Sequence, residues 1–151
     1  MAKVINLKSN IETIDIQNEE GKELVTIELN TADDTYFVRF MSLYEDLGAL
    51  VEKVKREVKT LELKEAKDGL DTKTAKKILD INMEATKEIS RMTDDLFGEG
   101  FTRKLFAENY EVNPNFSPNI RLFQNFYTGV MPVIQEYYKD SVKNYSVTKG
   151  R

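Results

Sequence analysis

The chain contains no histidine, no cysteine and no tryptophan among its 151 residues. It therefore has no disulfide, no cysteine nucleophile, no imidazole base, no zinc site built from thiolates or imidazoles, and no haem held by either. The lack of cysteine gives no evidence on the redox compartment, although a cytosolic home is the simpler interpretation. Any chemistry would have to use carboxylates, lysine, tyrosine, serine or threonine.

Long apolar runs are also missing. The first ten residues lack the apolar stretch of roughly 7–15 residues that a secretory signal needs. No later segment approaches the ~20 apolar residues of a membrane span. With 40% hydrophobic and 32% charged residues, the composition is typical of soluble globular proteins. We expect one soluble domain, residues 1–151, that stays in the cytoplasm and does not bind membranes.

The net charge is −4, and positive charge is in excess only toward the C-terminal end. Residues 113–151 carry 5 basic and 2 acidic side chains, including Lys139, Lys143, Lys149 and Arg151. A nucleic-acid footprint usually needs a denser basic cluster. We therefore favour a solvated, flexible tail over residues 146–151 and do not expect nucleic-acid binding.

The first third of the chain predicts a short β element, residues 1–34. Apolar and polar residues alternate at 14–16 and at 25–29, the period of a strand with one buried face. Between them Gly21 can adopt the positive φ that a tight turn needs. A β-hairpin over about residues 11–30 follows, and two strands alone must lie on helices or add to another sheet.

From Thr35 the apolar period becomes that of a helix, and a helical body is expected over residues 35–145. One stripe repeats in heptads and is listed as Phe37, Phe40, Tyr44, Leu47, Val51, Val54, Val58 and Leu61. Two long helices are predicted, at about 35–66 and 72–97, joined by a short loop as an αα-hairpin. A plain amphipathic helix is favoured over an intermolecular coiled coil.

Caps for these two helices are also predicted, with alternatives left open. Asp33, Asp34 or Thr35 can cap the first helix, and Asp71 or Thr72 the second.

The rest of the chain predicts a short helix near 102–108 and a final helix over about 118–144. Ser117 as N-cap and Pro118 at the first helical position indicate where the final helix begins. Pro132 lies in its middle and predicts a kink. The fold class is thus α+β and mainly helical.

The final helix has more apolar surface than one core contact requires, since its apolar residues cover more than half of the helical wheel. Of the 15 Phe and Tyr residues in the chain, 11 lie in residues 97–151. Either this helix is central and covered on several sides, or part of its face is left for another protein. The candidate partner-binding residues are Phe123, Phe126, Tyr127, Met131, Ile134, Tyr137 and Tyr138.

No catalytic or cofactor site is indicated. The densest acidic group is Asp94, Asp95 and Glu99, and adjacent residues on a helix point about 100° apart, so they do not naturally share a proton or a metal ion. Gly98-Glu99-Gly100 lacks the remaining residues of a dinucleotide or nucleoside-triphosphate loop. We expect no catalytic residue, no metal and no cofactor, and a binding protein rather than an enzyme.

The run Asp94-Asp95-Leu96-Phe97-Gly98-Glu99-Gly100, followed by Lys104-Leu105-Phe106, resembles a segment of the tail assembly chaperones of long-tailed phages and prophages. The layout is similar too: a β-rich start, a helical body and a final apolar and aromatic helix. The long stretch between Asn109 and Phe116 departs from that pattern.

The resemblance implies a non-catalytic factor in the cytoplasm of the infected or lysogenic bacterium. It would bind the helical tape measure protein and help to recruit tail tube subunits, and such proteins often have a longer frameshifted form. Self-association is compatible with this role. In the motif we expect structural roles, with Phe97 and Phe106 anchoring the hairpin end and Gly98 and Gly100 turning the chain.

Three other functions stay open. The chain could be a minor structural tail or connector protein of the particle, a host-directed regulator or nucleic-acid binder using the basic end, or an enzyme using Asp94 or Asp95.

Overall fold

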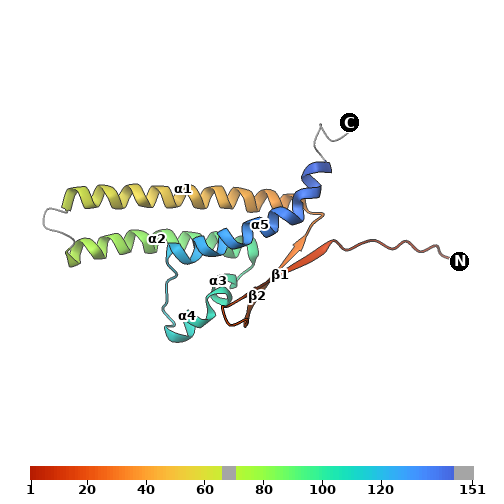
Figure 1. Cartoon of the computed structure of the whole chain (residues 1–151), viewed down its shortest axis with the longest axis horizontal. Helices are drawn as coiled ribbons and strands as arrows, with labels where there is room; N and C mark the ends of the chain where they lie inside the picture. The colour runs from red at the N-terminus through yellow and green to blue at the C-terminus, as the bar shows by residue number, and fades with distance from the viewer. Residues whose placement is uncertain (66–70, 145–151) are drawn as a thin grey trace.

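The fold is a mainly helical α+β arrangement with one two-stranded sheet at the N-terminal end (Figure 1). The computed structural model describes residues 1–65 and 71–144. The predicted tail at 146–151 lies outside the described residues, as does residue 66, the predicted last residue of the first long helix.

The predicted β-hairpin is present. Strands β1 (Ile11–Gln17) and β2 (Glu23–Asn30) pair antiparallel, with Ile14 opposite Ile27. Gly21 has φ +84° in the turn, a conformation that L side chains rarely adopt. The apolar residues of β2 face the helices, so the strand joins the core that the helices form.

The two long helices form the predicted αα-hairpin. Helix α1 spans Asp34–Glu65 and helix α2 spans Thr72–Phe97. Of the candidate caps, Asp33 accepts hydrogen bonds from amides of the first turn of α1 at 3.0 and 3.3 Å. Asp71 accepts from the Thr74 amide at 2.7 Å and caps α2. The hydroxyl of Thr35 also donates to Asp33, and this bond, followed by the amide bonds, lowers the pKa of the Asp33 carboxyl. The bond from the Thr74 amide lowers the pKa of the Asp71 carboxyl, since it favours the ionised form.

The single short helix expected near 102–108 is two helices. Helix α3 spans Phe101–Leu105 and helix α4 spans Ala107–Val112. The chain changes direction between them at Phe106, whose ring is buried.

The C-terminal helix α5 spans Ile120–Asn144 and so begins two residues later than predicted. The side chain of Asn119 accepts from the Leu122 amide at 3.0 Å, so Asn119 rather than Ser117 provides the cap. Helix α5 continues through Pro132, and it bends in its C-terminal half (Figure 1).

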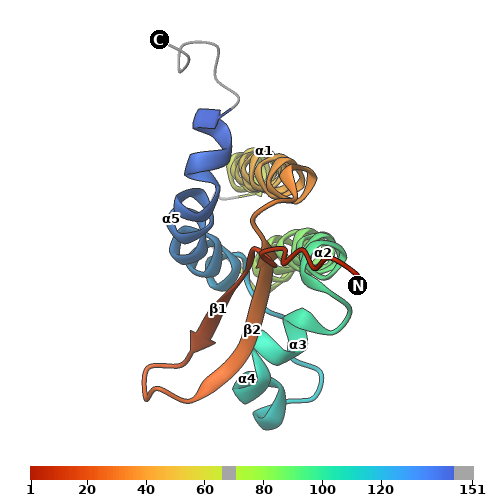
Figure 2. The ribbon, with the colours of Figure 1, turned by 90° about the vertical axis from the view of Figure 1, so that its right-hand side faces the viewer.

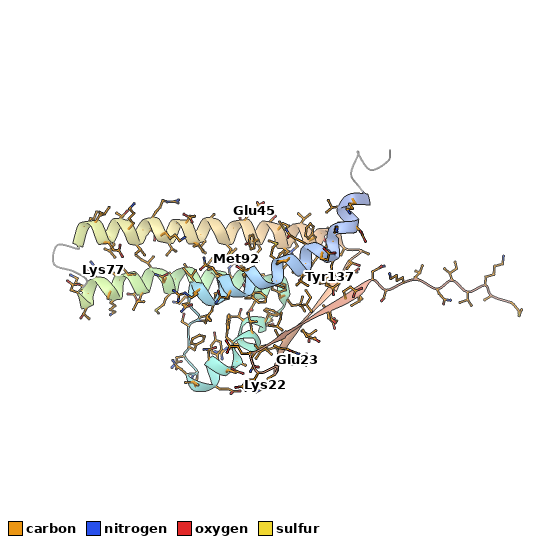
Figure 3. All side chains as sticks on the ribbon, in the orientation of Figure 1. Lys22, Glu23, Glu45, Lys77, Met92 and Tyr137 are labelled. Carbon is orange, nitrogen blue, oxygen red and sulfur yellow. The ribbon has the colours of Figure 1, made fainter. Side chains whose placement is uncertain are left out.

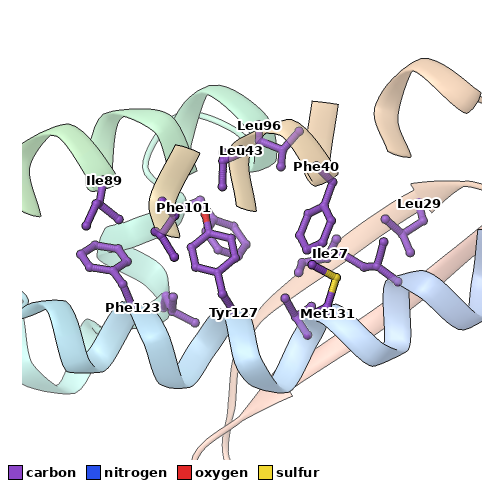
Figure 4. Packing of buried hydrophobic residues seen from close by; sticks show 14 of the residues in the cluster. Ile27, Leu29, Phe40, Leu43, Ile89, Leu96, Phe101, Phe123, Tyr127 and Met131 are labelled. Carbon is purple, nitrogen blue, oxygen red and sulfur yellow. The ribbon is translucent and has the colours of Figure 1, made fainter. Parts of the chain in front are cut away.

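The helices and the sheet enclose one core, with α5 at its centre. Helix α5 lies beside α1 and α2 with the β-hairpin crossing near one end, while α3 and α4 lie below α2 (Figure 2). Helices α1 and α2 extend well past the start of α5, as a two-helix arm (Figure 1). The side chains that meet in the core include Ile27, Leu29, Phe40, Leu43, Ile89, Leu96, Phe101, Phe123, Tyr127 and Met131 (Figure 4).

Candidate interaction surfaces

Most of the predicted partner-binding face of α5 is core. Five of the seven candidate residues are buried, listed as Phe123, Tyr127, Met131, Ile134 and Tyr138. Of the two alternatives that the sequence left open, the structure has the central, covered helix at these five positions. The physical reason is that α1, α2, α3 and the sheet cover α5 on several sides at once. Apolar residues surround more than half of α5 because these elements pack against it on more than one side.

Tyr127 shows how completely this face is used. Its ring is 1% exposed and forms a triangle with the rings of Phe40 and Phe97, whose centroids are 6.3 and 6.4 Å from its own and 6.2 Å from each other. Its hydroxyl is 2.7 Å from Oγ1 of Thr93, which also donates to the carbonyl of Ile89. Burial raises the pKa of the Tyr127 hydroxyl, so it stays neutral.

Tyr138 joins α5 to both the sheet and α1. Its ring stacks on Phe37 at 4.8 Å, and its hydroxyl donates to the carbonyl of Asn30 at 2.8 Å. Burial, with the charges of Asp33 and Asp34, raises the pKa of this hydroxyl. The remaining two candidates, Phe126 and Tyr137, are half-buried.

The segment that carries the family resemblance turns the chain from α2 into α3. Gly98 has φ +122° and Gly100 has φ +80°, so both positions favour glycine. The ring of Phe97 contacts four other aromatic rings, and Phe106 meets the ring of Phe123 edge to face at 5.4 Å. Asp94 accepts from the amide and hydroxyl of Thr102, both at 2.8 Å, and so ties the start of α3 to the end of α2.

The acidic residues near this turn have structural partners. Asp95 pairs with Arg91 at 2.8 Å on the exposed side of α2, and Arg91 also pairs with Glu88. Neither Asp94 nor Asp95 is oriented toward a shared metal or proton. Within the described residues, no group of three or more acidic side chains could hold a metal ion.

An open groove continues the line of α5 along the two-helix arm. Beside α5, the residues Tyr44, Gly48 and Val51 of α1 face Gln124 and Thr128 of α5. Past the start of α5, the same side of α1 lines a groove of about 500 Å³. We call it the distal groove; it is lined by Val54, Lys55, Val58, Lys59, Glu62 and Asn82.

Helix α2 adds apolar surface near the distal groove. Leu79 lies one turn before Asn82, and it is also two heptads before Thr93, the residue that contacts α5. It is 61% exposed. On the opposite side of the arm, a second hollow of about 600 Å³ includes Leu61 and Ile81.

A separate hollow lies between the hairpin turn and α4. We call it the hairpin crevice; its volume is about 820 Å³. Its apolar residues include Leu105, Phe106, Leu122 and Phe126. Its charged residues are Glu19, Glu20, Lys22, Glu108 and Glu111. Asn18 donates to the carboxylate of Glu108 and links the turn to α4.

Sequence reasoning did not find this crevice, because it joins residues about ninety positions apart. The sequence holds only a weak signal for the crevice, namely two short acidic clusters close to apolar residues. The clusters are Glu19 with Glu20 and Glu108 with Glu111.

Comparison with protein-family models, curated protein sequences and solved structures finds no match to this chain. Among the described residues, no helix has both the length and the apolar character needed to cross a membrane.

Proposed function

We propose that this protein is a non-catalytic phage tail assembly chaperone that binds helical segments of the tape measure protein. The surface that supports this proposal best is the distal groove, because it continues the seat of α5 where no helix of the described chain fills it. The motif resemblance supplies the partner. In the same proposal, the chain acts in the bacterial cytoplasm and helps to bring tail tube subunits to its client.

The physical basis is helix-in-groove docking. Near the β-hairpin, α1, α2 and α5 lie side by side as three helices, and their apolar faces are covered (Figure 2). Along the arm the third position is open, and Val58 is half-buried while Leu79 is exposed. An amphipathic client helix would cover these side chains as α5 covers Val51. Lys55, Lys59 and Glu62 at the groove would pair with charges on its polar flank.

Modest affinity is enough for such a chaperone. The groove is short, so one copy would cover only a few helical turns of a client. Many copies along one long helical protein would gain avidity without tight single contacts. This also fits a factor that must be released when the tail assembles.

A pull-down with matched variants tests the proposal. The chain is co-expressed with a tagged tape measure protein encoded beside it, and the captured amount is measured. Leu79→Glu places a charge beside the distal groove, and Val38→Glu places one on α1 near the opposite face; both side chains are 61% exposed. We expect Leu79→Glu to weaken capture by about tenfold or more, since burying a leucine contributes about 1.5–3 kcal/mol. Val38→Glu should leave capture unchanged.

Equal capture of both variants would contradict the assignment of the groove, and no capture of the wild type would contradict the client. The alternative, a minor structural tail or connector protein, is tested by analysing purified particles. Stoichiometric amounts of this chain in the finished virion would favour that alternative over the chaperone.

A further inference from the structure

The first ten residues form an extended segment that carries three exposed aliphatic side chains. In this subsection we call this segment the arm; it is distinct from the two-helix arm of α1 and α2. Val4, Ile5 and Leu7 are 81%, 83% and 88% exposed, and the segment has no regular secondary structure. Lys3 and Lys8 stand on either side of them, and the segment has no acidic residue. The side chains of the arm stand clear of the rest of the fold (Figure 3). A short basic segment with so much exposed aliphatic surface suits a binding partner.

The root of the arm is fixed to the hairpin. The carbonyl of Asn10 accepts from the amide of Thr31 at 2.9 Å and from its hydroxyl at 3.2 Å. Asn10 has φ +58°, and its side-chain amide donates to the carbonyl of Lys8 at 3.1 Å. The arm therefore leaves the open end of the hairpin in a defined direction, away from the helices (Figure 1).

The hairpin crevice has the complementary chemistry. Its apolar residues offer a surface for aliphatic side chains, and four of its five charged residues are glutamates. Phe126 and Leu122 are only half-buried there, so apolar surface is left for a ligand to cover. The glutamates lie on both the hairpin turn and α4, so carboxylates are available to lysines at both ends of a short extended segment.

The crevice lies at the opposite end of the hairpin from the arm. It is lined by residues at the turn, whereas the arm begins before Ile11 at the open end and points away (Figures 1 and 3). To reach the crevice of its own copy, the arm would have to reverse its direction at Asn10. It can reach the crevice of a second copy without such a reversal. The six residues from Lys3 to Lys8 span roughly 20 Å when extended, a length suited to a groove of this kind.

We propose that residues 3–8 of one copy bind in the hairpin crevice of a second copy of this chain. Val4, Ile5 and Leu7 cover the apolar surface, and the two lysines pair with the glutamates. The contact joins two different surfaces, so it is heterologous and builds a chain or a ring of copies unless two copies exchange arms. This inference is independent of the proposed function and is tested without a client.

The first test changes the apolar part of the arm in the full-length chain. Sedimentation velocity over a wide concentration range should show reversible association of the wild type. Val4→Ser/Ile5→Ser/Leu7→Ser should weaken that association by about tenfold or more. Val38→Ser, which alters an exposed valine on α1, should leave it unchanged.

The second test reverses the charges on each side of the contact. Lys3→Glu/Lys8→Glu and Glu20→Lys/Glu111→Lys should each weaken self-association. An equimolar mixture of the two variants should restore it, because each arm then meets a crevice of opposite charge. Misfolding of either variant could not produce such a rescue. Added salt should weaken wild-type association by screening.

Control and overturning outcomes are defined for both tests. Glu45→Lys/Glu99→Lys makes the same change of charge at exposed positions outside the crevice, and it should not alter association; Glu45 lies on α1 (Figure 3). A wild type that stays monomeric overturns the proposal. This holds also where hydrogen exchange shows that the arm of the monomer is protected, because the arm would then bind the crevice of its own copy. Association that survives the arm substitutions, or charge-reversed variants that do not rescue each other, overturns it too.

Discussion

Tyr138 and Tyr137 are neighbours on α5 that the structure places in different environments. Tyr138 is 0% exposed, stacks on Phe37 and donates to the carbonyl of Asn30, whereas Tyr137 is half-buried. Removing a fully buried aromatic ring costs about 3–5 kcal/mol, including the cavity left behind. We therefore expect Tyr138→Ala to lower the free energy of unfolding by about 4 kcal/mol and Tyr137→Ala by about 1 kcal/mol.

The hydroxyl and the ring of Tyr138 can be separated. Tyr138→Phe keeps the ring and removes one hydrogen bond, for about 1 kcal/mol. The carbonyl of Asn30 then still accepts from the amide of Asp33 at 2.9 Å, so no buried acceptor is left without a donor. The order of stability should be wild type, Tyr138→Phe, Tyr138→Ala.

Urea unfolding followed by far-UV circular dichroism measures these differences, and thermal unfolding checks them. For a domain of this size each kcal/mol lowers Tm by roughly 2–4 °C, so Tyr138→Ala should lose roughly 8–16 °C. Equal losses for Tyr137→Ala and Tyr138→Ala would refute the packing of α5 against α1 and the sheet. A Tyr138→Ala variant with wild-type stability and lost client binding would instead support the other alternative left open by the sequence, a face of α5 that serves a partner.

Three further comparisons test the turn between α2 and α3, the long helix α1 and the core. Asp94→Ala should cost about 1–2 kcal/mol by removing both hydrogen bonds from Thr102, whereas Asp95→Ala, which breaks an exposed ion pair, should cost under about 0.5 kcal/mol in the same urea assay. Gly48→Ala should stabilise α1 by up to about 1 kcal/mol, because its added Cβ meets open space, while Gly100→Ala, at φ +80°, should destabilise by about 1–2 kcal/mol. Because burial raises the pKa of Tyr127, the contribution of this residue to stability should be constant from neutral pH to about pH 10 and should fall above it, where only the unfolded state ionises freely. Tyr127→Phe should make that fall of Tm with rising pH shallower.

Local pattern was sufficient to predict most elements of this fold. The alternation in residues 11–30 and the heptads after Thr35 correspond to β1, β2 and α1, since each element must turn one apolar face inward. The choice among cap residues was not predictable, because Asp33, Asp34 and Thr35 all have suitable oxygens. The hydrogen bonds of the structure make the choice, since the amides of Thr35 and Tyr36 both donate to Asp33.

The coverage of α5 could not be predicted from the helix itself. A wide apolar circumference shows how much surface must be covered, and it does not show by which elements. The covering contacts come from distant positions: Asn30 meets Tyr138 from 108 residues away, and Thr93 meets Tyr127 from 34. Such contacts depend on how the αα-hairpin and the sheet are placed relative to α5. The apolar pattern of a single helix does not predict that placement.

The heptad stripe of α1 separates the covered part of the molecule from the open part. Val51 and Val58 occupy the same heptad position, and Val51 is 7% exposed beside α5 while Val58, past its start, is half-buried. The sequence continues the stripe, although residues 1–65 and 71–144 supply no third helix at that point. Variants that disturb α5 should therefore change stability first. If the proposed function holds, variants at the exposed positions of the distal groove, such as Lys59 and Glu62, should change partner binding with little change in stability. In the function that we propose, the surface that a client helix would cover is therefore on the two-helix arm, and α5 is the guide to the geometry of that contact.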